Sequence, residues 1–243
     1  MTLSSEYVVS DQACVTRQGK IYVMGGYDQN YITRDETFSI DVGAKTVTSL
    51  ASMPTRRGDA SAVYLREKDT AYIMGGFSDE NGWCSPLYEA EAYDFDMNKW
   101  EEISELNNNR GDKAVVILDQ KIYAIGGEEK HEDICEGGKD LEPSAHAVAV
   151  DDVESFDPFD KDAEWVVEAD FISYRFRAAA AAWEPTNSIY VFGGQKQYSK
   201  ECDCYATDDT VHYFRKVGGD DSAAVLPSMT SALGLVLMIM IIV

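Results

Sequence analysis

The chain repeats one pattern of apolar and polar positions along most of its length. A short apolar strand of small residues is followed by a polar turn and then by a second apolar strand that ends in two glycines. The second strands share the frame Tyr-x-x-Gly-Gly and begin at Tyr22, Tyr72, Tyr123 and Tyr190. Successive glycine pairs are 50, 51 and 67 residues apart. Recurrence at this period predicts a repeat architecture, in which function belongs to a surface that the units build together.

Each unit contains two further strands behind the glycine pair. The third strand ends in an acid and the fourth carries a large apolar residue, as Asp94 and Trp100 show in the second unit. Four short strands at this period indicate one blade of a β-propeller. The glycines suit strand ends where backbones approach closely, and the Tyr and Trp side chains are expected to pack between blades.

Taken together, the apolar strand, Tyr-x-x-Gly-Gly, Phe/Tyr-Asp, Trp and closing arginine resemble the kelch-repeat family over residues 10–214. The resemblance implies an all-β fold, a kelch-type β-propeller with four recognisable four-stranded blades. We place the blades at about 10–53, 58–106, 111–171 and 176–214. Kelch propellers usually have more blades, so the ring is either small or incomplete. The fourth unit lacks a fourth strand, and residues 4–9 are expected to supply it by pairing the two ends.

The charge of the chain argues against one class of function, nucleic-acid binding. The chain has 21 basic and 43 acidic residues and a net charge of −22. Nucleic acid is therefore not predicted as a partner, because binding it depends on neutralising phosphates with Lys and Arg. The acidic stretch 128–168 indicates a solvated loop, with a landing surface for a basic partner or a weak Ca²⁺ site as alternatives. No EF-hand spacing supports the calcium version.

No catalytic residue, cofactor or small-molecule ligand is indicated. Only three histidines are present, which is few for the copper site of oxidase-like kelch propellers. They are His131, His146 and His212. Zinc between His131, Cys135, Cys202 and Cys204 lacks Cys-x-x-Cys spacing, so no metal site is predicted. Loop cysteines also allow redox sensing, or a disulfide in an extracellular domain.

The last 22 residues, 222–243, carry no charge. As a helix at ~1.5 Å per residue they would reach ~33 Å, enough to span a bilayer. We predict a C-terminal apolar transmembrane or anchor helix there, joined by a linker over 215–221. The N-terminus shows no signal peptide, which favours a tail anchor and a cytosolic propeller. The alternative is a lipid-anchor signal and display at the cell surface.

Three arginines at the ends of units are the candidate partner-binding residues. Loops after second strands and links between blades emerge on one face, because consecutive antiparallel strands alternate in direction. That face gathers Arg57, Arg110 and Arg175. In kelch adaptors of ubiquitin ligases, arginines on this face bind acidic motifs, and the resemblance implies the same here. The alternative is that each arginine pairs with a local acid. Trp83 is the expected aromatic anchor.

The tripeptides Arg57-Gly-Asp59 and Arg110-Gly-Asp112 invite an integrin-ligand interpretation. They occupy the same position in successive units, so a turn that opens the next blade explains both. The sequence thus predicts a non-enzymatic protein–protein interaction module, a kelch-repeat scaffold or adaptor tethered to a membrane. The alternatives are a propeller enzyme, oxidase-like or sugar-processing, and an extracellular lipid-anchored adhesion module.

Overall fold

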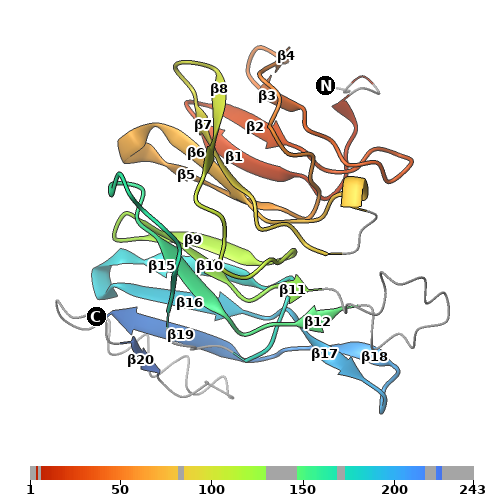
Figure 1. The fold of residues 1–243 in the computed structure, drawn as a ribbon, viewed down its shortest axis with the longest axis vertical. Coiled ribbons are helices and arrows are strands. Elements are labelled where there is room, and N and C mark those ends of the chain that lie inside the picture. The colour runs from red at the N-terminus through yellow and green to blue at the C-terminus, as the bar shows by residue number, and fades with distance from the viewer. Residues whose placement is uncertain are drawn as a thin grey trace.

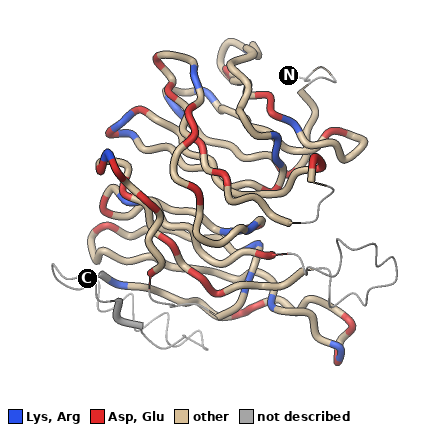
Figure 2. The backbone as a smooth tube through the Cα atoms, in the orientation of Figure 1, with Lys and Arg blue, Asp and Glu red and all other residues tan. Residues whose placement is uncertain are grey.

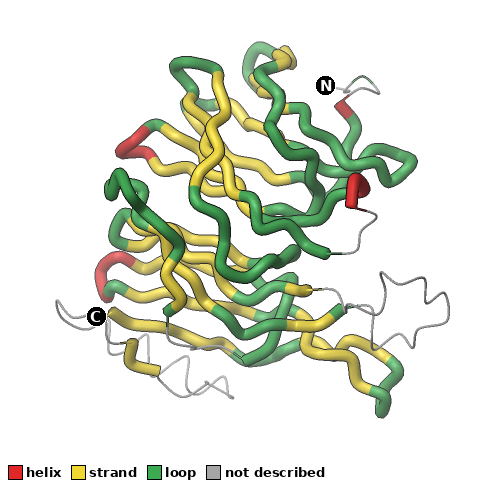
Figure 3. Tube along the Cα trace, in the orientation of Figure 1, coloured by secondary structure: helices red, strands yellow, loops and turns green. Residues whose placement is uncertain are grey.

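The computed structural model describes Ser4 and residues 7–81, 85–129, 147–168, 173–216 and 223–225. Strands and loops make up nearly all of this part of the chain, with only short helical turns (Figure 3). Four antiparallel sheets of four strands each form the blades. The four blades predicted from the repeats are thus present.

Each blade runs from an inner to an outer strand in chain order. Blade 1 consists of β1 (Ala13–Arg17), β2 (Lys20–Met24), β3 (Thr37–Asp41) and β4 (Thr46–Ser49). Blade 2 consists of β5 (Ser61–Leu65), β6 (Thr70–Met74), β7 (Ala90–Asp94) and β8 (Lys99–Ile103). Blade 3 consists of β9 (Ala114–Leu118), β10 (Lys121–Ile125), β13 (Val153–Phe156) and β14 (Val166–Val167). Blade 4 consists of β15 (Ala179–Trp183), β16 (Ser188–Phe192), β19 (Val211–Lys216) and β20 (Ala223–Val225).

The blades are layered one on the next, from blade 1 at the top of Figure 1 to blade 4 at the bottom. The inner strands β1, β5, β9 and β15 lie side by side in this order. Two short hairpins extend the loop face, β11 (Glu128–Glu129) with β12 (Val148–Ala149) and β17 (Gln195–Ser199) with β18 (Cys204–Thr207). This face, on the right of Figure 1, carries the loops after the second strands.

Glycine pairs end the second strands because the link to the next blade passes directly over them. Gly25 and Gly26 both have positive φ, +63° and +96°. A Cβ on Gly25 would overlap the carbonyl oxygen of Arg57, and the Gly26 N–H donates to that same oxygen at 2.8 Å. Gly76 and Gly127 donate in the same way to the next links. The repeated glycines therefore stitch each blade to its successor.

Apolar side chains fill the space between neighbouring blades. Between blades 1 and 2, buried Met24, Ile73 and Tyr93 pack with Trp100. The indole N–H of Trp100 donates to Ala51 O at 3.0 Å, and that of Trp165 to Ser104 O at 3.0 Å, so each Trp also bonds to the preceding blade. Their predicted place between blades is confirmed.

The expected pairing of the chain ends is wrong. The Tyr7 ring packs on Phe38 of blade 1, with centroids 4.9 Å apart, and its hydroxyl lies 3.1 Å from the Ser49 hydroxyl. Tyr7 therefore lies on blade 1, the blade that follows it in the chain. Blade 4 receives its fourth strand from β20, which pairs with β19. The repeat pattern did not reveal β20 because it is only three residues long and carries no Trp.

The predicted C-terminal helix over 222–243 is not supported either, because Ala223–Val225 form a strand. Residues 226–243 lie outside the described part of the chain. Among the residues that the structure describes, no helix has the length and apolar character needed to cross a membrane.

Candidate binding face at the propeller axis

The three candidate arginines are buried, each inside the blade that follows it. Arg57 leaves the link after blade 1 and enters blade 2. Its Nη1 donates to the carbonyls of Gly75 at 3.0 Å and Glu89 at 2.8 Å, and its Nη2 to the Glu91 carboxylate at 2.8 Å. Both side chains of this ion pair are fully buried. Burial lowers the pKa of Arg57 and raises that of Glu91, and their pairing opposes both shifts.

Arg110 repeats this arrangement, and Arg175 varies it with an acid from the segment before β19. Arg110 bonds to Gly126 O at 3.2 Å, Asp152 O at 2.8 Å and the Glu154 carboxylate. Arg175 bonds to Gly193 O at 3.1 Å and to Asp208 at 3.0 Å. We call these three residues the linker arginines. Each one ties a blade link to the glycine end of the next second strand.

Blade 1 has no preceding arginine, and its acid is missing as well. Val9 stands where the other blades have arginine, since Val9-Ser-Asp aligns with Arg57-Gly-Asp. Phe38 stands opposite Val23 in the register that places Glu91 opposite Ile73. In blade 1 the apolar residues Val9 and Phe38 thus stand in place of the ion pair. This is expected if the arginine and its acid have a structural function within the blade.

This geometry corrects the partner-binding assignment of Arg57, Arg110 and Arg175. Their side chains are 0% exposed and their donors already meet carboxylates and carbonyls of the blade. A partner cannot reach them without opening the blade, so the local-acid alternative describes them. Trp83, the fourth candidate, lies outside the described residues.

The Arg-Gly-Asp tripeptides are explained by the same packing. Their arginines are buried, and a Cβ on Gly58 would overlap the ring of Tyr27 from the preceding blade. Gly111 stands in the same relation to Phe77. The middle residue is therefore glycine because the aromatic ring lies over it. An RGD-reading receptor would not find the arginine on the surface.

The last residues of these tripeptides reach the propeller axis, which the sequence did not reveal. Asp11, Asp59, Asp112 and Arg177 are equivalent and share φ values of 53°, 51°, 48° and 55°. Their backbones form a ladder, in which Asp59 N–H donates to Asp11 O at 2.9 Å, Asp112 N–H to Asp59 O at 3.0 Å, and Arg177 N–H to Asp112 O at 2.8 Å. One residue of each blade is thereby held beside the axis.

A pocket of about 270 Å³ opens between these four residues, lined also by Gln12, Ser61 and Lys113. Arg177 Nε donates to Asp112 at 2.8 Å, and the Tyr27 hydroxyl donates to Asp59 at 2.7 Å. Lys113 turns away from the pocket, because its Nζ donates to the carbonyl of Met74. Burial holds the Lys113 pKa well below its ordinary value. Three carboxylates therefore face one exposed cation.

Burial raises the pKa values of two carboxylates of the pocket, Asp59 and Asp112, and neighbouring carboxylates raise them further. Burial, then the charge of Asp112, raises the pKa of Asp59 to about 6, while the Tyr27 hydrogen bond acts in the opposite direction. Burial also raises the pKa of Asp112 in spite of Arg177. Ionisation of both groups at neutral pH is thus costly, and a cation placed between them would relieve the cost.

Exposed aromatic side chains surround the pocket at a distance on the same face. Tyr31 on the loop after β2 is 72% exposed, Tyr88 on the loop after β6 is 43% exposed, and Tyr174 beside the third linker arginine is 58% exposed. We call the face formed by the axial pocket and these loops the axial face. Acidic positions, by contrast, are spread over all four blades (Figure 2).

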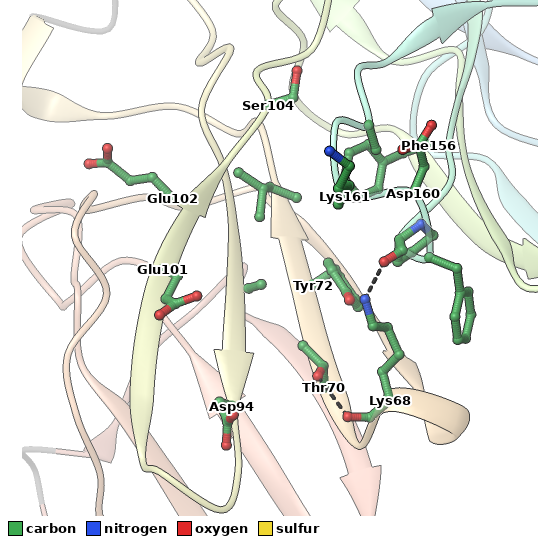
Figure 4. A pocket seen from close by; sticks show the side chains of 15 residues that line it. Lys68, Thr70, Tyr72, Asp94, Glu101, Glu102, Ser104, Phe156, Asp160 and Lys161 are labelled. Carbon is green, nitrogen blue, oxygen red and sulfur yellow. Dashed lines mark hydrogen bonds between the residues drawn. The ribbon is translucent and has the colours of Figure 1, made fainter.

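A larger hollow of about 520 Å³ lies on the opposite side, between blades 2 and 3 (Figure 4). Its walls are β7 and β8 on one side and the turn after β13 on the other. Lys68 crosses it, donating to Pro158 O and lying 5.2 Å from the centre of the Phe159 ring. This groove is therefore bridged by contacts that join the two blades, and we place the candidate site on the axial face.

Two of the loop cysteines are bonded to each other. Cys202 and Cys204 form a disulfide at the β17–β18 turn. This bond removes both from the zinc set considered above, whose other members His131 and Cys135 lie outside the described residues. Within the described ranges, no three His, Cys, Asp or Glu side chains are arranged to hold a metal ion.

The fold defined by these blades is a β-propeller, and a solved structure confirms it. The chain matches "Structure of YjhT" with a TM-score of 0.68 at 17% identity, over 92% of this chain and 66% of that one. At this identity the likeness concerns the fold alone.

Sequence comparisons find similarity to kelch-repeat proteins. The kelch motif matches residues 68–107, which is most of blade 2. Kelch repeat-containing protein kel-10 of Caenorhabditis elegans is 30% identical over 128 residues, 52% of this chain and 21% of that protein. Kelch-like protein 25 of Xenopus tropicalis is 25% identical over 206 residues, 82% of this chain and 31% of that protein. Blade 2 therefore matches the kelch motif and the chain is similar to kelch-repeat proteins, as the resemblance implied.

The chain spans only part of each relative. Kelch-like protein 41a of Danio rerio, 29% identical over 119 residues, is matched over 19% of its length. The activities and partners of such longer proteins are consequently not transferred to this chain.

Proposed function

We propose that this chain is a non-enzymatic protein-binding module that recognises its partner on the axial face. The observation that carries the proposal is the pocket in which three backbone-fixed aspartates from three blades face one exposed arginine. Proteins similar to this chain are named kelch-like proteins, which is in keeping with a binding role.

The chemistry of the face favours a basic segment of the partner, not the acidic motif that the linker arginines suggested. A Lys or Arg side chain in the pocket would lie between Asp59 and Asp112 and stabilise their ionised forms, whose cost on burial raises both pKa values. Charge-assisted hydrogen bonds to carboxylates are short and strong. Tyr31, Tyr88 and Tyr174 would add contact area, since exposed aromatic residues are enriched at interface hot spots.

A phage-displayed random peptide library panned on the immobilised full chain tests this proposal. We expect enrichment of peptides rich in Lys or Arg, and loss of their binding to the double variant Asp59→Asn/Asp112→Asn. The matched control is Glu101→Gln/Glu102→Gln, which removes the same charge from β8, away from the axis. Enrichment of acidic peptides, or equal losses in the two double variants, would refute a basic partner at the axis.

Membrane attachment is a separate part of the proposal. It rests on the uncharged sequence after β20, residues 226–243, and the predicted orientation keeps the propeller in the cytosol. Chains ending at Val225 and Val243 should differ in membrane fractionation, with only the longer one resisting alkaline extraction. Equal extraction of both would remove the anchor from the proposal.

A further inference from the structure

The outward side of blade 4 has the residue pattern of a surface that another blade covers. In β9, Ala114, Val116 and Leu118 point toward blade 4 and are buried in the core between blades 3 and 4. The equivalent positions of β15 are Ala179, Ala181 and Trp183, and all three are exposed. Trp183 is 45% exposed, against 0% for Leu118.

The second strand repeats this contrast. Met74 of blade 2 and Ile125 of blade 3 are buried under the next blade, at 0% and 1% exposure. Phe192 holds the same register position in blade 4 and is 40% exposed. Its ring stacks on Tyr190, with centroids 6.3 Å apart. We call the surface formed by Ala179, Ala181, Trp183 and Phe192 the blade 4 end face.

Blade 1 shows the reverse pattern at the other end of the stack. Ala13 and Val15 are buried toward blade 2, whereas the alternate residues Cys14 and Thr16 are exposed. In blade 4 the positions equivalent to Cys14 and Thr16 are Ala180 and Ala182, which pack against blade 3. We call the surface of Cys14 and Thr16 the blade 1 end face.

The axial ladder is open at the same two ends. Each bond of the ladder joins an N–H of one blade to a carbonyl of the blade before it. Among the described residues, the structure gives no such bond to the Asp11 N–H or to the Arg177 carbonyl. The ladder could therefore be extended at both ends, through the Asp11 N–H as a donor at blade 1 and the Arg177 carbonyl as an acceptor at blade 4.

We infer that the two end faces pair between two copies of this chain, blade 4 of each copy packing on blade 1 of the other. Inside the molecule, large side chains that point toward the next blade pack against small side chains of that blade. Leu118 and Ile125 of blade 3, for example, pack against Ala180 and Ala182 of blade 4. The two end faces are complementary in the same way. The blade 4 end face carries the large side chains of Trp183 and Phe192, and the blade 1 end face carries the smaller ones of Cys14 and Thr16.

Two-fold symmetry covers both faces at once. A head-to-tail contact closes into a ring when the rotation is right. Two copies of a four-bladed chain give a ring of eight, within the ~4–8 blades usual for propellers. In that ring, the Arg177 carbonyl of one copy would accept from the Asp11 N–H of the other, continuing the ladder.

Sedimentation equilibrium of the full chain in a mild detergent tests the inference. We expect twice the chain mass of 27.0 kDa, and return to the single mass in Ala181→Arg. Val166→Arg, on an exposed position of the outer strand β14, is the matched control and should remain dimeric. A monomeric chain, or a dimer unchanged by Ala181→Arg, would overturn the inference.

Cysteine cross-linking gives a second readout that does not depend on a disruptive variant. Cys14 is exposed on the blade 1 end face, and Ala181→Cys places a thiol on the opposite face. Mild oxidation should give a disulfide-linked dimer with Ala181→Cys, and none when Cys14→Ser is added. Ala180→Cys, which faces blade 3, is the control. A band that persists without Cys14, or is equally strong with Ala180→Cys, would also overturn the pairing.

Discussion

Replacing Asp59 by Asn should stabilise the protein at neutral pH. The pKa of Asp59 is about 6 in the folded protein, against an ordinary value of 3.8. Because the folded state holds the proton more tightly, stability is lost as the pH rises from about 4 to about 6. A shift of roughly 2 pKa units corresponds to about 3 kcal/mol, and partial exposure reduces this to about 2–3 kcal/mol.

Asparagine suits the position in other respects. It tolerates the φ of 51° at Asp59, and its amide oxygen can accept the Tyr27 hydroxyl. At about 2–4 °C per kcal/mol for a chain of this size, the melting temperature at pH 8 should rise by about 4–12 °C. Roughly half of the gain should remain at pH 5, where Asp59 is protonated in the folded protein.

Asp69→Asn is the matched control, with the opposite sign. Asp69 also has positive φ, but its bonds to Arg17 lower its pKa to about 2. Its ionised form therefore stabilises the fold at neutral pH, and that contribution is lost as the pH falls from about 4 toward 2. Thermal melts of the unchanged protein, Asp59→Asn and Asp69→Asn between pH 5 and 8 test this prediction. A destabilised Asp59→Asn, or a gain that does not grow with pH, would refute the account of the axial carboxylates.

Three further predictions follow from the blade contacts. Glu91→Ala leaves Arg57 buried without its carboxylate and should cost about 3–5 kcal/mol in chemical denaturation. Arg57→Val/Glu91→Phe installs the pair found in blade 1 and should be less destabilising than Glu91→Ala; a greater loss would argue against the equivalence. Gly58→Ala should cost about 1–3 kcal/mol because its methyl would overlap Tyr27, whereas Gly19→Ala meets no atom within 4 Å and should cost about 1 kcal/mol. Equal melting temperatures for the two alanine variants would show that the Tyr27 ring moves aside.

The strands of the blades could be predicted from the sequence because their signals are local. Tyr72, its glycine pair and Trp100 recur at fixed spacing, so a single unit is recognisable without its neighbours. The short strand β20 lacks these signals, and pairing to β19 is what makes it part of blade 4.

The candidate site was harder to predict because its residues act across blades. Arg57 looks like a surface cation until Glu91, 34 residues later, is brought beside it. The recurrence of Asp11, Asp59 and Asp112 two residues before an inner strand was the available signal. Their convergence at the axis follows only from the way the blades are layered.

The linker arginines also have a consequence for how the chain folds during synthesis. Arg57 is made 34 residues before Glu91, and Arg110 is made 44 residues before Glu154. At about 5–20 residues per second, Arg57 waits about 2–7 s on the ribosome for its carboxylate. Until then its charge stays in water and the link between blades 1 and 2 is not fixed. Each such link is therefore fixed only when most of the blade after it has emerged, and the order of synthesis becomes the order of assembly.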